Sequence, residues 1–279
     1  MTDLRKVVHG DDLLYRFFQE ALRDRPELFA AVPQLLVKTM AIWLPLETYF
    51  QWPIVLPWVV RDASCRGNRH KGIPDEWSSP DIRGYLRDDN SLIKSLPRAL
   101  AVRGPSGSHI QGARMGNEFV ASHVWRKVRH QELASRVPLL NSFVPNVAWL
   151  PGQVAKLTDR EGGVVQQTLQ AMSWQIYREA PVAPHLAVIV EEAWALLPRP
   201  AIEIEAFELD ELNWFQATEG FHRTRSSKLR AVVDALDAVA ESQTLPARVI
   251  TSRYAAGLPT VSHEARSDLR RFLARFLEP

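Results

Sequence analysis

Three residues in the middle of the chain have side chains suited to hydrolysing a phosphodiester: His123, Asn146 and Asp159. A histidine can take a proton from water near neutral pH when an acceptor or a backbone carbonyl fixes its tautomer. An asparagine can brace the loop that aims the histidine, and a carboxylate oxygen suits a hard cation such as magnesium. A divalent ion beside the phosphate would stabilise the leaving oxygen. These residue types in this order therefore indicate metal-assisted hydrolysis.

Two strands and a helix are needed to position these side chains, and the sequence around each residue predicts them. "EFVASHV" is an apolar strand with His123 near its end, and "NVAWLP" is a second apolar strand that opens at Asn146. Pro151 and Gly152 close the second strand, and the residues after them favour a helix that carries Asp159. The polar connection 127–137 between the strands is predicted to be helical.

The segments "ASHV", "PNVAWLP" and "LTDREG" resemble the HNH (ββα-metal) endonucleases, in particular those of restriction or defence type. The resemblance covers the centre of the chain only. It implies that His123 is the general base, that Asn146 braces the catalytic loop and that Asp159 is a metal ligand. It further implies that the cofactor is a divalent metal ion, Mg²⁺ or Mn²⁺, and that the substrate is DNA.

Two positions depart from the family's pattern. Ser122 stands where many members carry an acidic residue or a second histidine, and Ala155 stands where a histidine or asparagine is common. Glu118 and Glu161 are possible replacements for the missing ligands. A catalytically inactive nucleic-acid-binding or interaction protein on a ββα scaffold is therefore the alternative function, and a hydrolase on another helical fold is a third.

Basic residues flank the proposed site and could neutralise DNA phosphates. A second basic group lies in the polar segment 61–90, which is predicted to be a long surface loop. A solvated surface is the alternative interpretation of both groups. A further basic stretch, 221–230, could face DNA or could be only the start of a helix. The cations predicted to bind nucleic acid are Arg126, Lys127, Lys156, Arg160, Arg66, Arg69 and Lys71.

Other common catalytic patterns are absent from the sequence. It contains no G-x-x-x-x-G-K-[ST] phosphate loop, no H-E-x-x-H zinc pattern and no G-x-S-x-G serine elbow. No lysine has an acidic residue two positions before it, which disfavours the other large class of restriction nucleases. The single cysteine, Cys65, cannot form an intrachain disulfide or a cysteine-based zinc site.

Composition indicates a soluble globular protein, with 46% hydrophobic residues, 24% charged residues and a net charge of +2. The apolar run 40–60 is long enough to span a membrane. It contains three prolines and Glu47, however, so we predict buried irregular core instead. We expect a cytoplasmic protein that binds DNA and no membrane, because "MTDLRKVVHGDD" lacks the apolar region of a signal peptide. A homodimer is left open.

The predicted fold class is α+β, mainly helical with a central ββα-metal (HNH-like) core. Three regions are expected: a helical region 1–110 that holds the basic loop 61–90, the HNH-like core 111–180, and a mainly helical region 181–279. The alternation of apolar and acidic residues over 201–209 predicts a half-exposed strand. Helical spacing of apolar residues predicts helices at 11–24, 27–39, 163–179, 185–197, 226–241 and 262–277, although 185–197 could also form a strand.

Overall fold

The computed structural model describes residues 16, 19–20, 23–25, 28–57, 93–94, 96–128, 133–137, 139–241 and 263–277. Most of the helix predicted at 11–24 lies outside the described residues. The basic loop 61–90, with Arg66, Arg69 and Lys71, lies outside them entirely.

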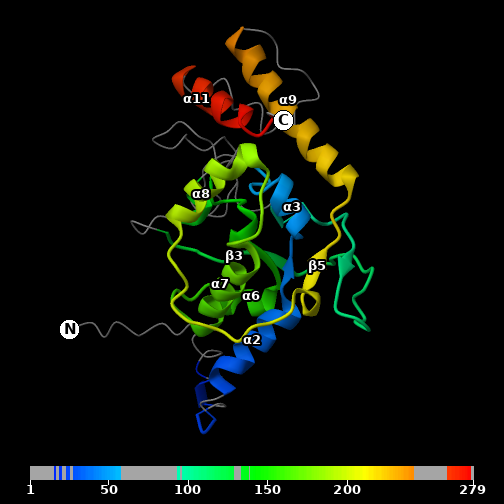
Figure 1. Ribbon diagram of the computed structural model, residues 1–279, viewed down its shortest axis with the longest axis vertical. Coiled ribbons are helices and arrows are strands. Elements are labelled where there is room, and N and C mark those ends of the chain that lie inside the picture. The colour runs from blue at the N-terminus through cyan, green and yellow to red at the C-terminus, as the bar shows by residue number, and fades with distance from the viewer. Residues whose placement is uncertain are drawn as a thin grey trace, which may run out of the picture.

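A five-stranded mixed sheet forms the centre of the molecule, in the order β2-β5-β1-β4-β3 (Figure 1). Its strands are β1 (Ile42–Trp43), β2 (Val102–Arg103), β3 (Phe119–His123), β4 (Val147–Pro151) and β5 (Asn213–Phe215). β1 and β5 are parallel, and the other neighbouring pairs are antiparallel. The predicted α+β class is confirmed, and one sheet takes strands from all three predicted regions.

Helices surround this sheet, with α2 at one end of the molecule and α9 and α11 side by side at the other (Figure 1). The helices predicted at 27–39, 163–179, 185–197 and 262–277 are confirmed. The helix predicted at 226–241 begins earlier, because the Thr218 side chain accepts a hydrogen bond from the Phe221 backbone N–H and caps α9. The helices are α2 (Leu28–Met40), α3 (Leu46–Gln51), α6 (Gly152–Thr158), α7 (Val164–Tyr177), α8 (Ala187–Leu196), α9 (Glu219–Ala240) and α11 (His263–Ala274).

Most of the described part of the apolar run 40–60 is buried, as predicted, although Met40 and Phe50 are exposed, and the run is more regular than expected. It supplies β1, the middle strand of the sheet, and then the short helix α3. Trp43 and Tyr49 from this run are buried and pack around Tyr177 of α7. Within the described part of the chain, no helix has both the length and the apolar character needed to cross a membrane.

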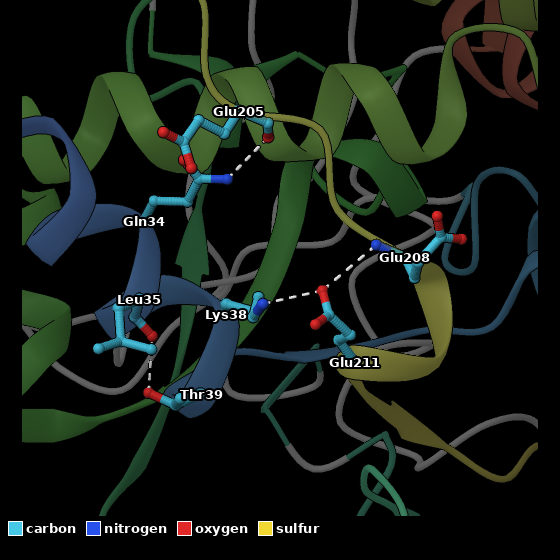
Figure 2. A network of polar contacts seen from close by, with 7 residues as sticks. All are labelled: Gln34, Leu35, Lys38, Thr39, Glu205, Glu208 and Glu211. Atoms are coloured by element: carbon cyan, nitrogen blue, oxygen red, sulfur yellow. Dashed lines mark hydrogen bonds and ion pairs between the residues drawn. The ribbon is translucent and has the colours of Figure 1, made fainter.

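The strand predicted at 201–209 is wrong, because this segment pairs with none of the described strands. It runs over α2 instead, where the Gln34 side chain donates to the Glu205 carbonyl at 2.8 Å. Lys38 of α2 pairs with Glu211 at 2.8 Å, as Figure 2 shows. In the segment 201–209, the half-buried residues Ile204 and Phe207 pack on the core from an irregular backbone. This packing accounts for the alternating pattern.

The helix predicted at 127–137 is also wrong in its described part. Lys127 and Leu133 form an isolated antiparallel bridge, and the Ala134 N–H donates to the Arg126 carbonyl at 2.9 Å. Only a short 3₁₀ helix, Ala134–Arg136, follows. The chain therefore turns back on itself directly after β3, which keeps this connection close to the end of that strand.

Candidate functional site

The proposed base lies at the edge of the sheet where β1, β3 and β5 all end. These three strands run in the same direction, because β4 is antiparallel to both β1 and β3, and β5 is parallel to β1. His123 is the last residue of β3 and is paired with Val147, the first residue of β4. The helices α3 and α9 begin at the same edge, soon after β1 and β5.

A backbone carbonyl fixes the tautomer of His123. The ring Nε2 lies 2.9 Å from the Asn141 carbonyl oxygen. A carbonyl can only accept a hydrogen bond, so Nε2 carries the proton and Nδ1 of the neutral ring is unprotonated. Burial lowers the pKa of this half-buried histidine, and the hydrogen bond to Asn141 opposes that shift only in part. The ring is therefore neutral at pH 7, as a general base requires.

The lowered pKa of His123 predicts a loss of stability in mild acid. The unfolded chain takes up a proton near pH 6.5 and the folded chain only at lower pH. As pH falls below 6.5 the unfolded state binds more protons, so the free energy of unfolding decreases by at most about 1.4 kcal/mol per pH unit. Urea unfolding at pH 7.5 and 5.5 should show a smaller decrease for His123→Gln than for the wild type. Equal decreases in the two proteins would contradict the assignment.

Asn146 ties together the two segments that hold His123. It is completely buried immediately before β4. Its Oδ1 accepts from the Trp125 backbone N–H at 2.7 Å, and its Nδ2 donates to the Leu140 carbonyl at 3.0 Å. Trp125 follows the histidine by two positions, and Leu140 precedes Asn141, whose carbonyl accepts from the ring. One amide therefore fixes both the loop after β3 and the acceptor of the histidine.

Helix α7 also holds these loops through polar side chains, and these contacts were not predicted from the sequence. Gln170 donates to the Val124 carbonyl at 3.4 Å, and the Ser173 hydroxyl donates to the Pro145 carbonyl at 2.5 Å. Trp125 is also buried, against Trp194 of α8. The signal available in the sequence was the helical spacing of Gln166, Gln170 and Ser173, three polar residues on the buried side of α7.

Helix α6 returns from the far end of β4 toward the loop that follows His123. It begins beside Glu118, where the Gly152 N–H donates to the Glu118 carbonyl at 2.7 Å. At its other end the Arg126 guanidinium donates to the Asp159 carbonyl. Asp159 was expected inside a helix, but it is instead the C-terminal cap of α6. Its exposed carboxylate lies 3.5 Å from the Lys156 ammonium.

The described side chains do not form a metal site of the family's kind. Within the described ranges, no three His, Cys, Asp or Glu residues lie close enough together to hold a metal ion. Glu118 precedes β3 and lies about 17 Å from His123 at the rise of an extended strand, so it cannot replace a ligand there. Asn141 offers one neutral oxygen: its amide is buried, and neither polar atom has a hydrogen-bond partner in the described structure.

The cations predicted around the site lie partly at one corner of the molecule. The hydrogen bond from Arg126 to the Asp159 carbonyl brings the loop after β3 to the end of α6, where Lys156 pairs with the Asp159 carboxylate. Arg126, Lys127, Lys156 and Arg160 are all exposed. Four cations against the two carboxylates of Asp159 and Glu161 leave this corner positively charged. We use the name β3–α6 corner for His123, Asn146 and Asp159 together with these four cations.

Comparisons of the chain with family models, with curated proteins and with solved structures give no match.

Proposed function

We propose that the chain is an HNH-type DNA endonuclease and that the β3–α6 corner is its active site. The observation that supports this most is the environment of His123. Its Nε2 proton is directed to a carbonyl, and the loops on both sides of it are joined by Asn146. Two antiparallel strands are followed by a helix that returns toward the loop after the histidine, and this order supports the resemblance of "ASHV", "PNVAWLP" and "LTDREG" to that family.

In the proposed reaction, Nδ1 of His123 accepts a proton from water while the water oxygen attacks the phosphorus of a phosphodiester. The new P–O bond forms as the bond to the 3′ oxygen breaks, which leaves a 5′-phosphate. The 3′ oxygen then takes a proton from solvent. Arg126 and Lys156 neutralise the charge of the bound phosphate backbone. A role in restriction or phage defence rests on the resemblance alone.

A divalent cation, Mg²⁺ or Mn²⁺, belongs to this proposal as a requirement for activity, although the described donors do not form its site. The experiment is incubation of the purified protein with supercoiled plasmid and with single-stranded DNA, unmodified or carrying modified bases. Each is tested with Mg²⁺, with Mn²⁺ and with excess EDTA. We expect cleavage with one of the metals and none with EDTA. If every substrate stays intact, the enzyme proposal is wrong.

The second candidate function is nucleic-acid binding without cleavage. Ser122, Ala155 and the absence of a three-ligand group in the described part of the chain favour it. The two proposals share the charged surface and differ in the chemistry. A gel-shift assay on the substrates of the cleavage experiment therefore separates them: binding of DNA that remains intact identifies the second.

Substitution of the corner cations should weaken DNA binding in both cases. Arg126→Gln and Lys156→Gln each remove one charge from an exposed position, so the fold should be kept. Each is expected to make the negative slope of log K against log salt shallower by about 0.9 on duplex DNA. Fluorescence anisotropy at several salt concentrations measures this slope. Arg103→Gln is the control, on β2 at the opposite edge strand, and a slope lowered equally by it would argue against the corner as the DNA contact.

A further inference from the structure

Arg225 occupies a position on α9 where the pattern calls for an apolar residue. The buried face of this helix runs through positions 225, 229, 232 and 236, at helical spacing. Leu229, Val232 and Leu236 fill three of these positions, and Arg225 fills the fourth with only 7% of its surface exposed. Burial of a charged side chain is costly unless another group compensates the charge. Its presence on this face therefore requires an explanation.

No carboxylate in the described structure compensates Arg225. Its Nε is buried and has no hydrogen-bond partner among the described residues. The nearest compensation is the ring of Phe221, one helical turn earlier, whose centroid lies 5.7 Å from the guanidinium carbon. Burial lowers the pKa of Arg225, with no opposing effect from an acidic neighbour. A neutral ring is a weak substitute for an anion.

A second cation lies beside it. Lys228 is three positions further along α9 and therefore on an adjacent part of the helix surface. Partial burial lowers the pKa of Lys228, and the positive charge of Arg225 lowers it further, so the two cations repel each other. His222, one turn earlier, cannot offset these charges, because an imidazole is either neutral or cationic; burial lowers its pKa, and its Nε2 lies 3.3 Å from the Thr48 hydroxyl. An anion between the two cations would remove both the repulsion and the unpaired donor.

We propose that Arg225 and Lys228 form a phosphate-binding site on α9. The guanidinium presents donors in a fork that matches the oxygens of a phosphate, and the ammonium supplies a second charge. The phosphate can belong to a nucleic-acid backbone or to a small free phosphate. The nucleic-acid source rests on the proposed function, whereas the site itself does not.

The position of α9 is compatible with the nucleic-acid source. α9 follows β5, which ends at the same sheet edge as β3. β5 and β3 are separated by three strand spacings, about 14 Å at ordinary sheet geometry. The start of α9 therefore lies on the same side of the sheet as the end of β3, and a nucleic acid bound at His123 could extend from there toward the phosphate site.

The test uses the full chain, two probes and three variants. Lys228→Gln changes an exposed residue, and Arg225→Met keeps the length of the buried stem without its charge. Arg223→Gln is the matched control, because it removes an exposed arginine from the same helix. Thermal unfolding is followed with and without inorganic phosphate. Binding of duplex DNA is measured by anisotropy in the His123→Ala background, where cleavage does not interfere.

Phosphate should raise the unfolding temperature of the wild type and of Arg223→Gln by roughly 2–4 °C near saturation, and should have no such effect on the other two variants. Arg225→Met and Lys228→Gln should each weaken duplex binding by about 5–10-fold if the source is nucleic acid. A response to DNA alone identifies a backbone phosphate, and a response to phosphate alone identifies a small ligand. The site is disproved if both variants respond as the wild type does to both probes, or if Arg223→Gln loses as much. Absence of DNA cleavage would leave the phosphate result unaffected.

Discussion

Replacement of Asn146 by alanine is expected to lower the free energy of unfolding by about 2–5 kcal/mol and to reduce cleavage strongly. The substitution removes two hydrogen bonds of a completely buried amide, at 2.7 and 3.0 Å. It leaves the Trp125 N–H and the Leu140 carbonyl unpaired, each at a cost of about 1–3 kcal/mol. Activity should fall because these groups position the loops around His123. Urea unfolding and plasmid nicking measure the two effects.

Asn213 offers a matched control for Asn146. It is also a buried asparagine, and its Nδ2 donates to the carbonyls of Thr39 and Ala41 at 2.9 and 3.2 Å. Asn213→Ala should lose comparable stability and yet keep its nicking rate at a temperature where the protein is folded. NMR titration of His123 should show a changed pKa in Asn146→Ala and an unchanged one in Asn213→Ala. Equal effects of the two substitutions on nicking and on the pKa would show that Asn146 acts through stability alone.

Replacement of His123 by alanine should lower the rate of nicking by about 10²–10⁴-fold, the usual contribution of a positioned general base. Nδ1 accepts the proton of the attacking water, and an alanine has no group that can do so. The overall fold should persist, because the histidine is only half-buried. Circular dichroism checks the fold, and single-turnover nicking measures the rate.

The control for this variant is His185→Ala, which removes an exposed histidine in the 3₁₀ turn before α8. It should nick plasmid at the wild-type rate. A His123→Ala protein that is folded and as active as the wild type would move the active site elsewhere, even if the enzyme class is right. The pH dependence adds to this: the wild type should remain active somewhat below pH 6.5, because burial lowers the pKa of His123.

The elements around the site could be predicted because their limits are encoded locally. Pro151 and Gly152 follow an apolar run, and the pattern after them is helical, so the end of β4 and the start of α6 were predicted correctly. β1, β2 and β5 have only two or three residues each, and their pairing is decided by tertiary packing. The alternation of acidic and apolar residues at 201–209 is more typical of a strand than the three residues of β5 are, although only β5 forms one.

The site was predictable only as far as side chains specify it. The order of His123, Asn146 and Asp159 suggested that they meet, and the loop after β3 is indeed bonded to both Asn146 and Asp159. The Asn141 carbonyl could not be predicted, because a backbone acceptor leaves no mark on residue type. The burial of Arg225 could not be predicted either. The helix was expected to begin at 226, and only the observed start of α9 at Glu219 places Arg225 on its buried face.

The most direct test of the central claim, that the β3–α6 corner cleaves DNA, is a nicking time course on supercoiled plasmid with the wild type and His123→Ala side by side. Both proteins are used at the same concentration with Mg²⁺ or Mn²⁺. We expect the wild type to convert the plasmid to the nicked or linear form and the variant to leave it supercoiled over the same period. Plasmid left intact by the wild type, or cut equally fast by the two proteins, would contradict the claim.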